Sequence, residues 1–214
     1  LFRSRSLVDH TLDICQRNLT LHGVDPKHDL ELNGQRVHFS TAGAAVHVAD
    51  PENNTYRNST SQDLYDMARI ADTCEHIHMF QRMCVLRDID DPKTMDLNTL
   101  YTSVIGNSKH IGTSFTEAEH VEDGLKMLHH FAGSEEAWRA RPFVSMSNCF
   151  VVPPMNFAEE SLECLRVGVE GGMPILLLSA GQAGATSPAL LAGAVSQAWA
   201  ECLGGLVYVN AIRS

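Results

Sequence analysis

The sequence lacks several patterns that would place it at once in a functional class. No apolar run reaches the ~20 residues that a membrane-spanning helix needs. The 16 basic residues are outnumbered by 26 acidic ones, and the formal net charge of −10 argues against a nucleic-acid backbone as the main partner. No C-x-x-C pair, H-E-x-x-H motif or glycine-rich nucleotide-binding motif occurs. We therefore expect no nucleic acid, no membrane and no bound metal.

The cysteines and the first residues both indicate a reducing compartment. Six cysteines lie without paired spacing, and four of them sit inside apolar runs, where cysteine behaves as a small hydrophobic residue. The segment from Leu1 to Arg5 offers neither a long apolar stretch nor a cleavage site, so no signal peptide is expected. A cytoplasmic protein is predicted, and the missing initiator methionine indicates that residues precede Leu1.

The composition and the predicted secondary structure change near residue 58. The first region is polar, rich in histidine and interrupted by Gly, Pro and Asn, which predicts short strands joined by tight turns. The turns are expected at residues 33–34 and 50–54, and the strands at 36–39, 44–48 and 55–57. We therefore assign residues 1–58 to an N-terminal extension with a small antiparallel sheet, and residues 59–214 to a second unit.

Strand and helix patterns alternate regularly in the second unit. The strand-like segments begin near residues 77, 110, 142, 174 and 206. Their spacing, close to 32 residues, is typical of successive βα units. An open doubly wound sheet and part of an eight-stranded barrel both fit this spacing. We favour the barrel, because an open sheet would normally end with a covering helix, whereas this pattern ends on a strand at 206–209.

The predicted fold is therefore α/β, a partial (β/α)8 TIM-type barrel with an N-terminal antiparallel β/α extension. Such a barrel needs ~250 residues, so the part over residues 59–214 is expected to be incomplete at its C-terminus. Local signals predict some helix boundaries. Thr60 and Asp63 have capping-box spacing, Ser187-Pro188 is typical of a helix start, and Gly204-Gly205 is typical of a helix end.

The carboxyl ends of parallel strands form the sites of α/β proteins, so the residues there are the candidates. Hydroxyl, amide and aromatic side chains dominate these positions, and no cluster of Glu, Asp and His for acid–base chemistry is evident. No residue is assigned a catalytic role. The predicted substrate-binding residues are Phe80, Thr113, Ser114, Phe115, Ser147, Asn148, Phe150, Gln182, Thr186, Tyr208 and Asn210.

Each candidate feature also has a structural interpretation. Aromatic faces such as those of Phe80, Phe115 and Phe150 can recognise a quaternary ammonium group, but aromatics at strand ends also fill cores. The loop 181–188 could present N–H groups to an anion at a helix start, or it could be a tight turn. Isolated histidines are more often surface or core residues than ligands, and Cys149 has no histidine at a predictable partner position.

Three segments of the second unit resemble the corrinoid-dependent trimethylamine methyltransferase superfamily. The most specific part is the G-x-T-S-P-x-x-L-A-G stretch from Gly184 to Gly193. The likeness is greatest to members that lack pyrrolysine, of the glycine betaine methyltransferase type, and it runs through the whole chain. The three segments are 109–115 (KHIGTSF), 145–154 (SMSNCFVVPP) and 180–189 (AGQAGATSPA).

The resemblance implies a (β/α)8 barrel with an N-terminal extension. It also implies transfer of a methyl group from a methylated or quaternary amine, such as glycine betaine, to the Co(I) of a separate corrinoid protein. That partner would supply the cobalamin, so no cofactor is expected on this chain itself. Such a reaction needs mainly orientation of the methyl group and exclusion of water, which agrees with strand ends rich in binding groups.

Two other functions remain open. A non-catalytic module could bind betaine-like solutes, or the chain could be a degenerate paralogue. An unrelated barrel enzyme, such as a lyase or aldolase, would need a lysine or metal ligands at its strand ends. Whatever the reaction, the incomplete barrel is expected to be inactive alone and to form a homo-oligomer, because open strand edges and apolar surface promote association.

Overall fold

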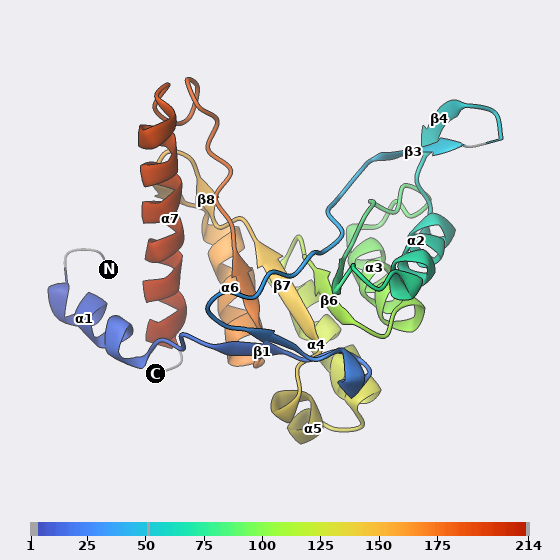
Figure 1. The fold of residues 1–214 in the computed structure, drawn as a ribbon, viewed down its shortest axis with the longest axis horizontal. Helices are drawn as coiled ribbons and strands as arrows, with labels where there is room; N and C mark the ends of the chain where they lie inside the picture. Colours follow the sequence, from blue (N-terminus) through green and yellow to red (C-terminus); the bar gives the residue numbers. More distant parts are fainter. Residues whose placement is uncertain (1–3, 51, 213–214) are drawn as a thin grey trace.

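A parallel sheet of four strands lies at the centre of the protein. The structure is a computed structural model that describes residues 4–50 and 52–212. Neighbouring strands follow the order β10-β7-β6-β5, and each pairing is parallel (Figure 1). The expected succession of parallel strands is confirmed for these four. They are β5 (Met79–Gln81), β6 (His110–Thr113), β7 (Val144–Asn148) and β10 (Ile175–Leu177).

Helices follow each of these strands in sequence. The expected capping box at the start of α2 is confirmed, because Thr60 accepts from the Asp63 N–H while Asp63 accepts from the Thr60 N–H. Gly133, with φ of 92°, ends α4 in the left-handed conformation that glycine adopts without strain. The helices are α2 (Ser61–Thr73), α3 (Pro92–Gly106), α4 (Ala118–Ala132), α5 (Glu135–Ala140), α6 (Glu159–Glu170) and α7 (Leu191–Ile212).

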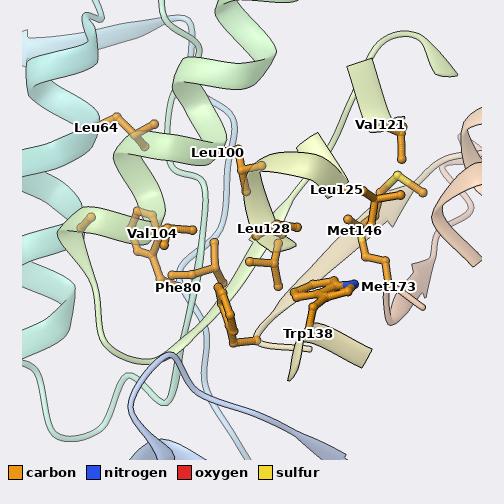
Figure 2. Close-up of a cluster of buried hydrophobic side chains, with 14 of the residues drawn as sticks. Leu64, Phe80, Leu100, Val104, Val121, Leu125, Leu128, Trp138, Met146 and Met173 are labelled. Carbon is orange, nitrogen blue, oxygen red and sulfur yellow. The ribbon is translucent and has the colours of Figure 1, made fainter. Parts of the chain in front are cut away.

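The main hydrophobic core lies between one face of the sheet and helices α2, α3, α4 and α6. Phe80, Ile111 and Met146 stand on that face of three neighbouring strands, and none of them is exposed. Figure 2 shows Phe80 and Met146 among the helical side chains that cover them. We call this side the helix-covered face. Since strand side chains alternate, the neighbours of these residues lie on the opposite, open face.

Helix α7 overturns three local predictions. It runs unbroken through 206–209, where a strand was expected, and it begins at Leu191 instead of at Ser187-Pro188. Gly204-Gly205 does not end it. A Cβ at Gly205 would overlap the ring of Phe150, so the glycine serves close packing of α7 on the sheet and not helix termination. Within the described residues, no helix, α7 included, is both long and apolar enough to cross a membrane.

One side of α7 and the neighbouring strand leave apolar side chains exposed. The exposed large hydrophobic residues of α7 recur every four positions, so they form a single stripe along the helix. Trp199 has an exposed fraction of 67%, and on β10 Leu176 reaches 48%. The fully apolar strand β10 is therefore not buried on both faces, as such strands of parallel sheets usually are. The stripe consists of Leu191, Val195, Trp199 and Leu203.

The N-terminal region contains two antiparallel pairs instead of one small sheet. The expected strand at 36–39 is absent, and the one expected at 44–48 is shifted to 47–50; Pro51, in the turn expected after it, lies outside the described residues. The β3–β4 hairpin projects beyond α2, away from the central sheet (Figure 1). The elements are α1 (Arg5–Ile14), β1 (Leu19–Leu21), the 3-10 turn Pro26–His28, β2 (Leu30–Leu32), β3 (His47–Asp50) and β4 (Thr55–Asn58).

Two further contacts join the N-terminal region to the central sheet. Residues 39–45 run along the outer edge of β5, where the Thr41 hydroxyl donates to the Gln81 carbonyl at 2.6 Å and accepts from the Gln81 N–H at 2.9 Å. The first strand therefore does not have the open edge that the sequence suggested. At the amino end of the sheet, Arg141 makes two hydrogen bonds of 2.9 Å to the carboxylate of Asp29, which lies just before β2.

His110 predicts a pH dependence of stability. Its Nδ1 donates to the His22 carbonyl at 2.7 Å, and burial lowers its pKa from 6.5 to about 4. Below pH 6.5 the unfolded chain binds a proton that the folded chain does not bind until about pH 4. Stability present above pH 6.5 is therefore lost as the pH falls through this window, by about 3 kcal/mol at most.

Urea unfolding at about pH 7 and about pH 5 measures this loss. We expect His110→Asn to flatten the decrease in unfolding free energy, because the buried group no longer titrates. The matched control is His10→Asn, which changes an exposed histidine and should keep the wild-type decrease. An equal decrease in wild type and His110→Asn would contradict the prediction.

Candidate functional site

The open face of the sheet carries a polar contact that spans three strands at their carboxyl ends. Gln81 ends β5, and its side chain crosses β6 above Gly112. There its Oε1 accepts a hydrogen bond of 3.4 Å from the hydroxyl of Ser147 on β7. A Cβ at Gly112 would overlap the Gln81 Oε1, so only glycine leaves this path free. Gln81 and Ser147 thus offer an amide and a hydroxyl on the face that none of the described helices covers.

Arg82 follows directly on the end of β5. Its N–H donates to the Gly112 carbonyl at 3.1 Å, which continues the parallel pairing by one residue. The side chain is half-buried, and burial lowers the pKa of its guanidinium, although the charge of Asp96 opposes this shift. Because strand side chains alternate, this positive charge lies on the helix-covered side with Phe80 and Asp96, opposite the Gln81–Ser147 contact.

A buried carboxylate joins α3 to the start of α4 at the same end of the sheet. Asp96 Oδ2 accepts from the Thr116 N–H and hydroxyl, each at 2.8 Å, and from His120 Nδ1 at 2.7 Å. Asp96 and His120 are both buried. Because all three donors converge on one oxygen, this cluster fixes the loop after β6.

A second buried carboxylate organises the loops after β7 and β10. Glu201 of α7 accepts from the Ser179 hydroxyl at 2.5 Å, the Met155 N–H at 2.9 Å and Gln197 Nε2 at 3.0 Å. Burial raises the pKa of Glu201, but these hydrogen bonds together hold it below its ordinary value. The same Gln197 amide also donates to the Thr186 carbonyl at 3.0 Å. Three segments at the carboxyl end of the sheet are thus tied to one charge.

The predicted polar residues of β6 and β7 divide between the two faces. Ser147 lies on the open face, as the Gln81 contact shows. Thr113 and Asn148 are buried, and the Asn148 amide donates to the Ser161 carbonyl at 3.1 Å. Ser114 is half-buried and follows Thr113 into the loop. Only Ser147 of these four is brought into the Gln81 contact.

The predicted aromatic faces are already in use as core. Phe80 is fully buried under the helices, and Phe115 packs against Gly124 of α4. Phe150 is fully buried and meets the ring of Phe157 edge-on at 5.3 Å between ring centres. The alternative interpretation, aromatics that fill the core, is therefore correct for Phe80 and Phe150. They present no face to a cationic ligand.

Two predicted residues lie far from the strand ends. Tyr208 and Asn210 were chosen because a strand was expected at 206–209, and the structure places both on α7. Tyr208 packs in a second core cluster between α6 and α7, and Asn210 donates to the Leu206 carbonyl of its own helix at 2.9 Å. They were selected because 206–209 was taken as a strand, whereas the segment is helical, so they are not site residues at a strand end.

The glycine-rich loop after β10 is a self-contained turn. The Gln182 N–H donates to the Thr186 hydroxyl at 2.9 Å, and the N–H groups of residues 185–187 all donate to the Gln182 carbonyl at 3.0 Å. Gly184 has φ of 82°, and its N–H donates to the Ser187 carbonyl. These N–H groups are already paired and do not form an anion cradle. Gln182 is exposed and Thr186 is half-buried. Thr186 contacts the Glu201 cluster, because its carbonyl accepts from Gln197, whereas Gln182 is joined to that cluster only through its hydrogen bond to Thr186.

Comparison with known proteins identifies the relatives of this arrangement. A family model described as trimethylamine methyltransferase (MTTB) matches residues 2–214, nearly the whole chain. The chain belongs to the trimethylamine methyltransferase family. A trimethylamine methyltransferase MttB of Desulfitobacterium hafniense is 30% identical over 201 residues, which are 94% of this chain and 40% of the relative.

Other members of the family show similar relationships. A trimethylamine methyltransferase MttB of Methanosarcina thermophila is 28% identical and aligns with 94% of this chain. A glycine betaine methyltransferase, also from Desulfitobacterium hafniense, is 26% identical over 100% of this chain. The chain spans only 40% to 44% of the length of these curated relatives. The family is therefore established, whereas the activity of the whole protein is a matter for proposal.

Sequence reasoning missed Gln81 and Glu201 as members of the site. Gln81 could have been found, because the period of a strand places it on the face of the sheet opposite the buried Phe80. Glu201 had no local signal. Its partners Ser179 and Met155 lie 22 and 46 residues away in sequence, so only the fold brings them together.

Replacement of Glu201 tests its role as the anchor of the strand-end loops. Glu201→Gln keeps the shape but removes the charge and sets a second donor against Ser179 or Gln197. We expect a loss of about 2 kcal/mol in unfolding free energy, since charge-assisted hydrogen bonds disappear. Glu163→Gln, which changes an exposed carboxylate of α6, is the control and should leave the thermal midpoint almost unchanged. Equal midpoints for the two variants would contradict the anchoring role.

Gly112 predicts a steric coupling with Gln81. Gly112→Ala should displace the Gln81 side chain and lower stability by about 1 kcal/mol, because the obstructing atom is the end of a flexible side chain. In a Gln81→Ala background, the same substitution should cost much less. Denaturant unfolding of the two single variants and the double variant measures the coupling. Strictly additive effects would show that Gln81 does not lie over Gly112.

Proposed function

We propose that the protein containing this chain transfers a methyl group from a methylated amine or betaine to the Co(I) of a corrinoid protein. The observation that carries the proposal is the family match over residues 2–214. The names of its relatives, trimethylamine methyltransferase and glycine betaine methyltransferase, supply the two substrate types. The corrinoid protein is the proposed partner, and the proposed setting is the cytoplasm.

The arrangement of the sheet supports a (β/α)8 barrel as the architecture of the whole protein. Four parallel strands carry their core helices on one face, whereas an open doubly wound sheet is covered on both. In a barrel the uncovered face becomes the interior, and the strand carboxyl ends form the rim where reactions occur. Gln81 and Ser147 would then line the rim from the inside.

The proposed reaction makes modest demands on protein side chains. The bond between nitrogen and the methyl carbon breaks, and its electron pair stays on the amine, which leaves with one methyl group fewer. The new bond joins the same carbon to cobalt, and both of its electrons come from the reduced metal. The protein must orient the methyl group and exclude water. Neutral hydrogen-bonding groups on a rigid rim, such as Gln81 and Ser147, suit this task.

The carboxylate clusters support the site without taking part in chemistry. Asp96 and Glu201 are buried, and each accepts three hydrogen bonds from the protein, which suits a structural role. We propose that they hold the rim loops in place. The exposed apolar stripe of α7 could bury its side chains against a second copy, in line with the expected self-association. That self-association stays a prediction, which light scattering of the purified protein measures directly.

The test is methyl transfer by the protein at its full natural length. Purified enzyme, a Co(I) corrinoid protein and either glycine betaine or trimethylamine are mixed without oxygen, and cobalt methylation is followed by absorbance. We expect methylation with at least one amine and a demethylated amine in equal amount by NMR. Amine binding in calorimetry without any methylation would instead favour the non-catalytic binding module. No response to any methylated amine in either measurement would overturn the proposal.

A further inference from the structure

We propose that Gln81 selects the substrate by donating hydrogen bonds from its amide nitrogen to a carboxylate of the substrate. This inference rests on the proposed function and deepens it, because it names the substrate class: a molecule that carries a methylated nitrogen and a carboxylate together. Ser147 is a positioning residue in this scheme, since it acts by orienting the Gln81 amide. The observations behind the proposal are the accessible place of Gln81 on the open face and the direction in which its amide is held.

The open face of the sheet is closed toward its amino end. Ile111 and Met146 point into the core, so their neighbours His110 and Ser145 lie on the open face. Both neighbours are nevertheless buried. The His110 Nδ1 donates to the carbonyl of His22, so the segment that follows β1 lies over the amino end of β6. The N-terminal region thus closes the open face at the level of these residues.

The same face is accessible near the carboxyl ends of the strands. Gln81 and Ser147 are both half-buried. Leu176 of β10 pairs in register with Ser147, so its side chain lies on the same face, and its exposed fraction is 48%. A small molecule that enters from the carboxyl end can therefore contact an amide, a hydroxyl and an apolar side chain, whereas the N-terminal region lies beneath them.

The contact with Ser147 decides which end of the Gln81 amide meets a ligand. The Ser147 hydroxyl donates to Gln81 Oε1, which lies above Gly112, where no side chain stands in its way. The acceptor of the amide is thus engaged by the protein. The Gln81 Nε2 makes no hydrogen bond within the described part of the chain, so its two N–H donors are left for a ligand.

The main chain at Gln81 is held in place from the outer edge of β5. The Thr41 hydroxyl donates to the Gln81 carbonyl at 2.6 Å and accepts from the Gln81 N–H at 2.9 Å. On the other side, Gln81 pairs with Gly112 of β6. A side chain that starts from a fixed backbone loses less freedom when it binds, which favours a role in recognition.

Free N–H donors distinguish between the two substrate types that the relatives' names supply. A carboxylate has two oxygens that accept hydrogen bonds, and bonds to an ionised acceptor are stronger than those between neutral groups. A quaternary ammonium group accepts none. The rings of Phe80 and Phe150 are buried and present no aromatic face to such a group. What Gln81 can recognise is therefore the anionic end of the substrate.

The test compares two ligands that differ in the carboxylate. Calorimetry with the protein at its full natural length measures binding of glycine betaine and of tetramethylammonium, which is a quaternary ammonium ion alone. Gln81→Glu keeps the shape of the side chain but replaces the donors by a negative charge. We expect it to weaken glycine betaine about 10- to 100-fold and to leave tetramethylammonium unchanged or tighter. Gln81→Ala, which removes the amide without adding a charge, should weaken glycine betaine about 10-fold.

A double-variant comparison tests the positioning role of Ser147. Ser147→Ala removes the donor that orients the amide, and we expect glycine betaine affinity to fall about 2- to 10-fold. In a Gln81→Ala background, the same substitution should have almost no effect on this affinity, because no amide remains to be oriented. An undiminished effect in that background would show that Ser147 does not act through Gln81.

Gln35→Glu is the matched control, since it makes the same charge change at an exposed glutamine of the N-terminal region and should change neither affinity. Thermal midpoints of all variants show whether each one folds. Equal glycine betaine affinity in wild type and in the folded Gln81 variants would overturn the role of Gln81, and so would an equal loss for both ligands. Absence of methyl transfer in wild type refutes only the proposed function, because the binding comparison still decides whether Gln81 holds the carboxylate.

Discussion

Burial of one face of the parallel sheet is the constraint on which the rest of this structure depends. Phe80, Ile111 and Met146 stand in line on neighbouring strands, and their contact with four helices removes them from water. Because strand side chains alternate, this choice forces the next residues onto the opposite face. Gln81 and Ser147 are there for that reason. The hydrophobic core thus selects which polar groups can meet a ligand.

The carboxyl end of the sheet is held by two buried carboxylates. Glu201 and Asp96 each accept three hydrogen bonds, and together they fix the loops after β6, β7 and β10. Both carboxylates hold these loops through hydrogen bonds that close within the described part of the chain.

Family membership gives this arrangement a chemical context. The match covers nearly the whole chain, and the relatives carry names of methyltransferases that act on trimethylamine or glycine betaine. The chain spans less than half of the length of those relatives.

The sequence by itself determined the family, the four parallel strands and the Thr60–Asp63 cap, because these depend on contiguous motifs, on spacing and on local hydrogen bonds. The tertiary structure alone decided the course of the last helix. Gly204-Gly205 is a stop signal locally, but close packing of Gly205 on Phe150 outweighs the cost of glycine in a helix. It also decided the site, since the contacts of Gln81 with Ser147 and of Glu201 with Met155 join residues far apart in the chain, and no local pattern encodes them.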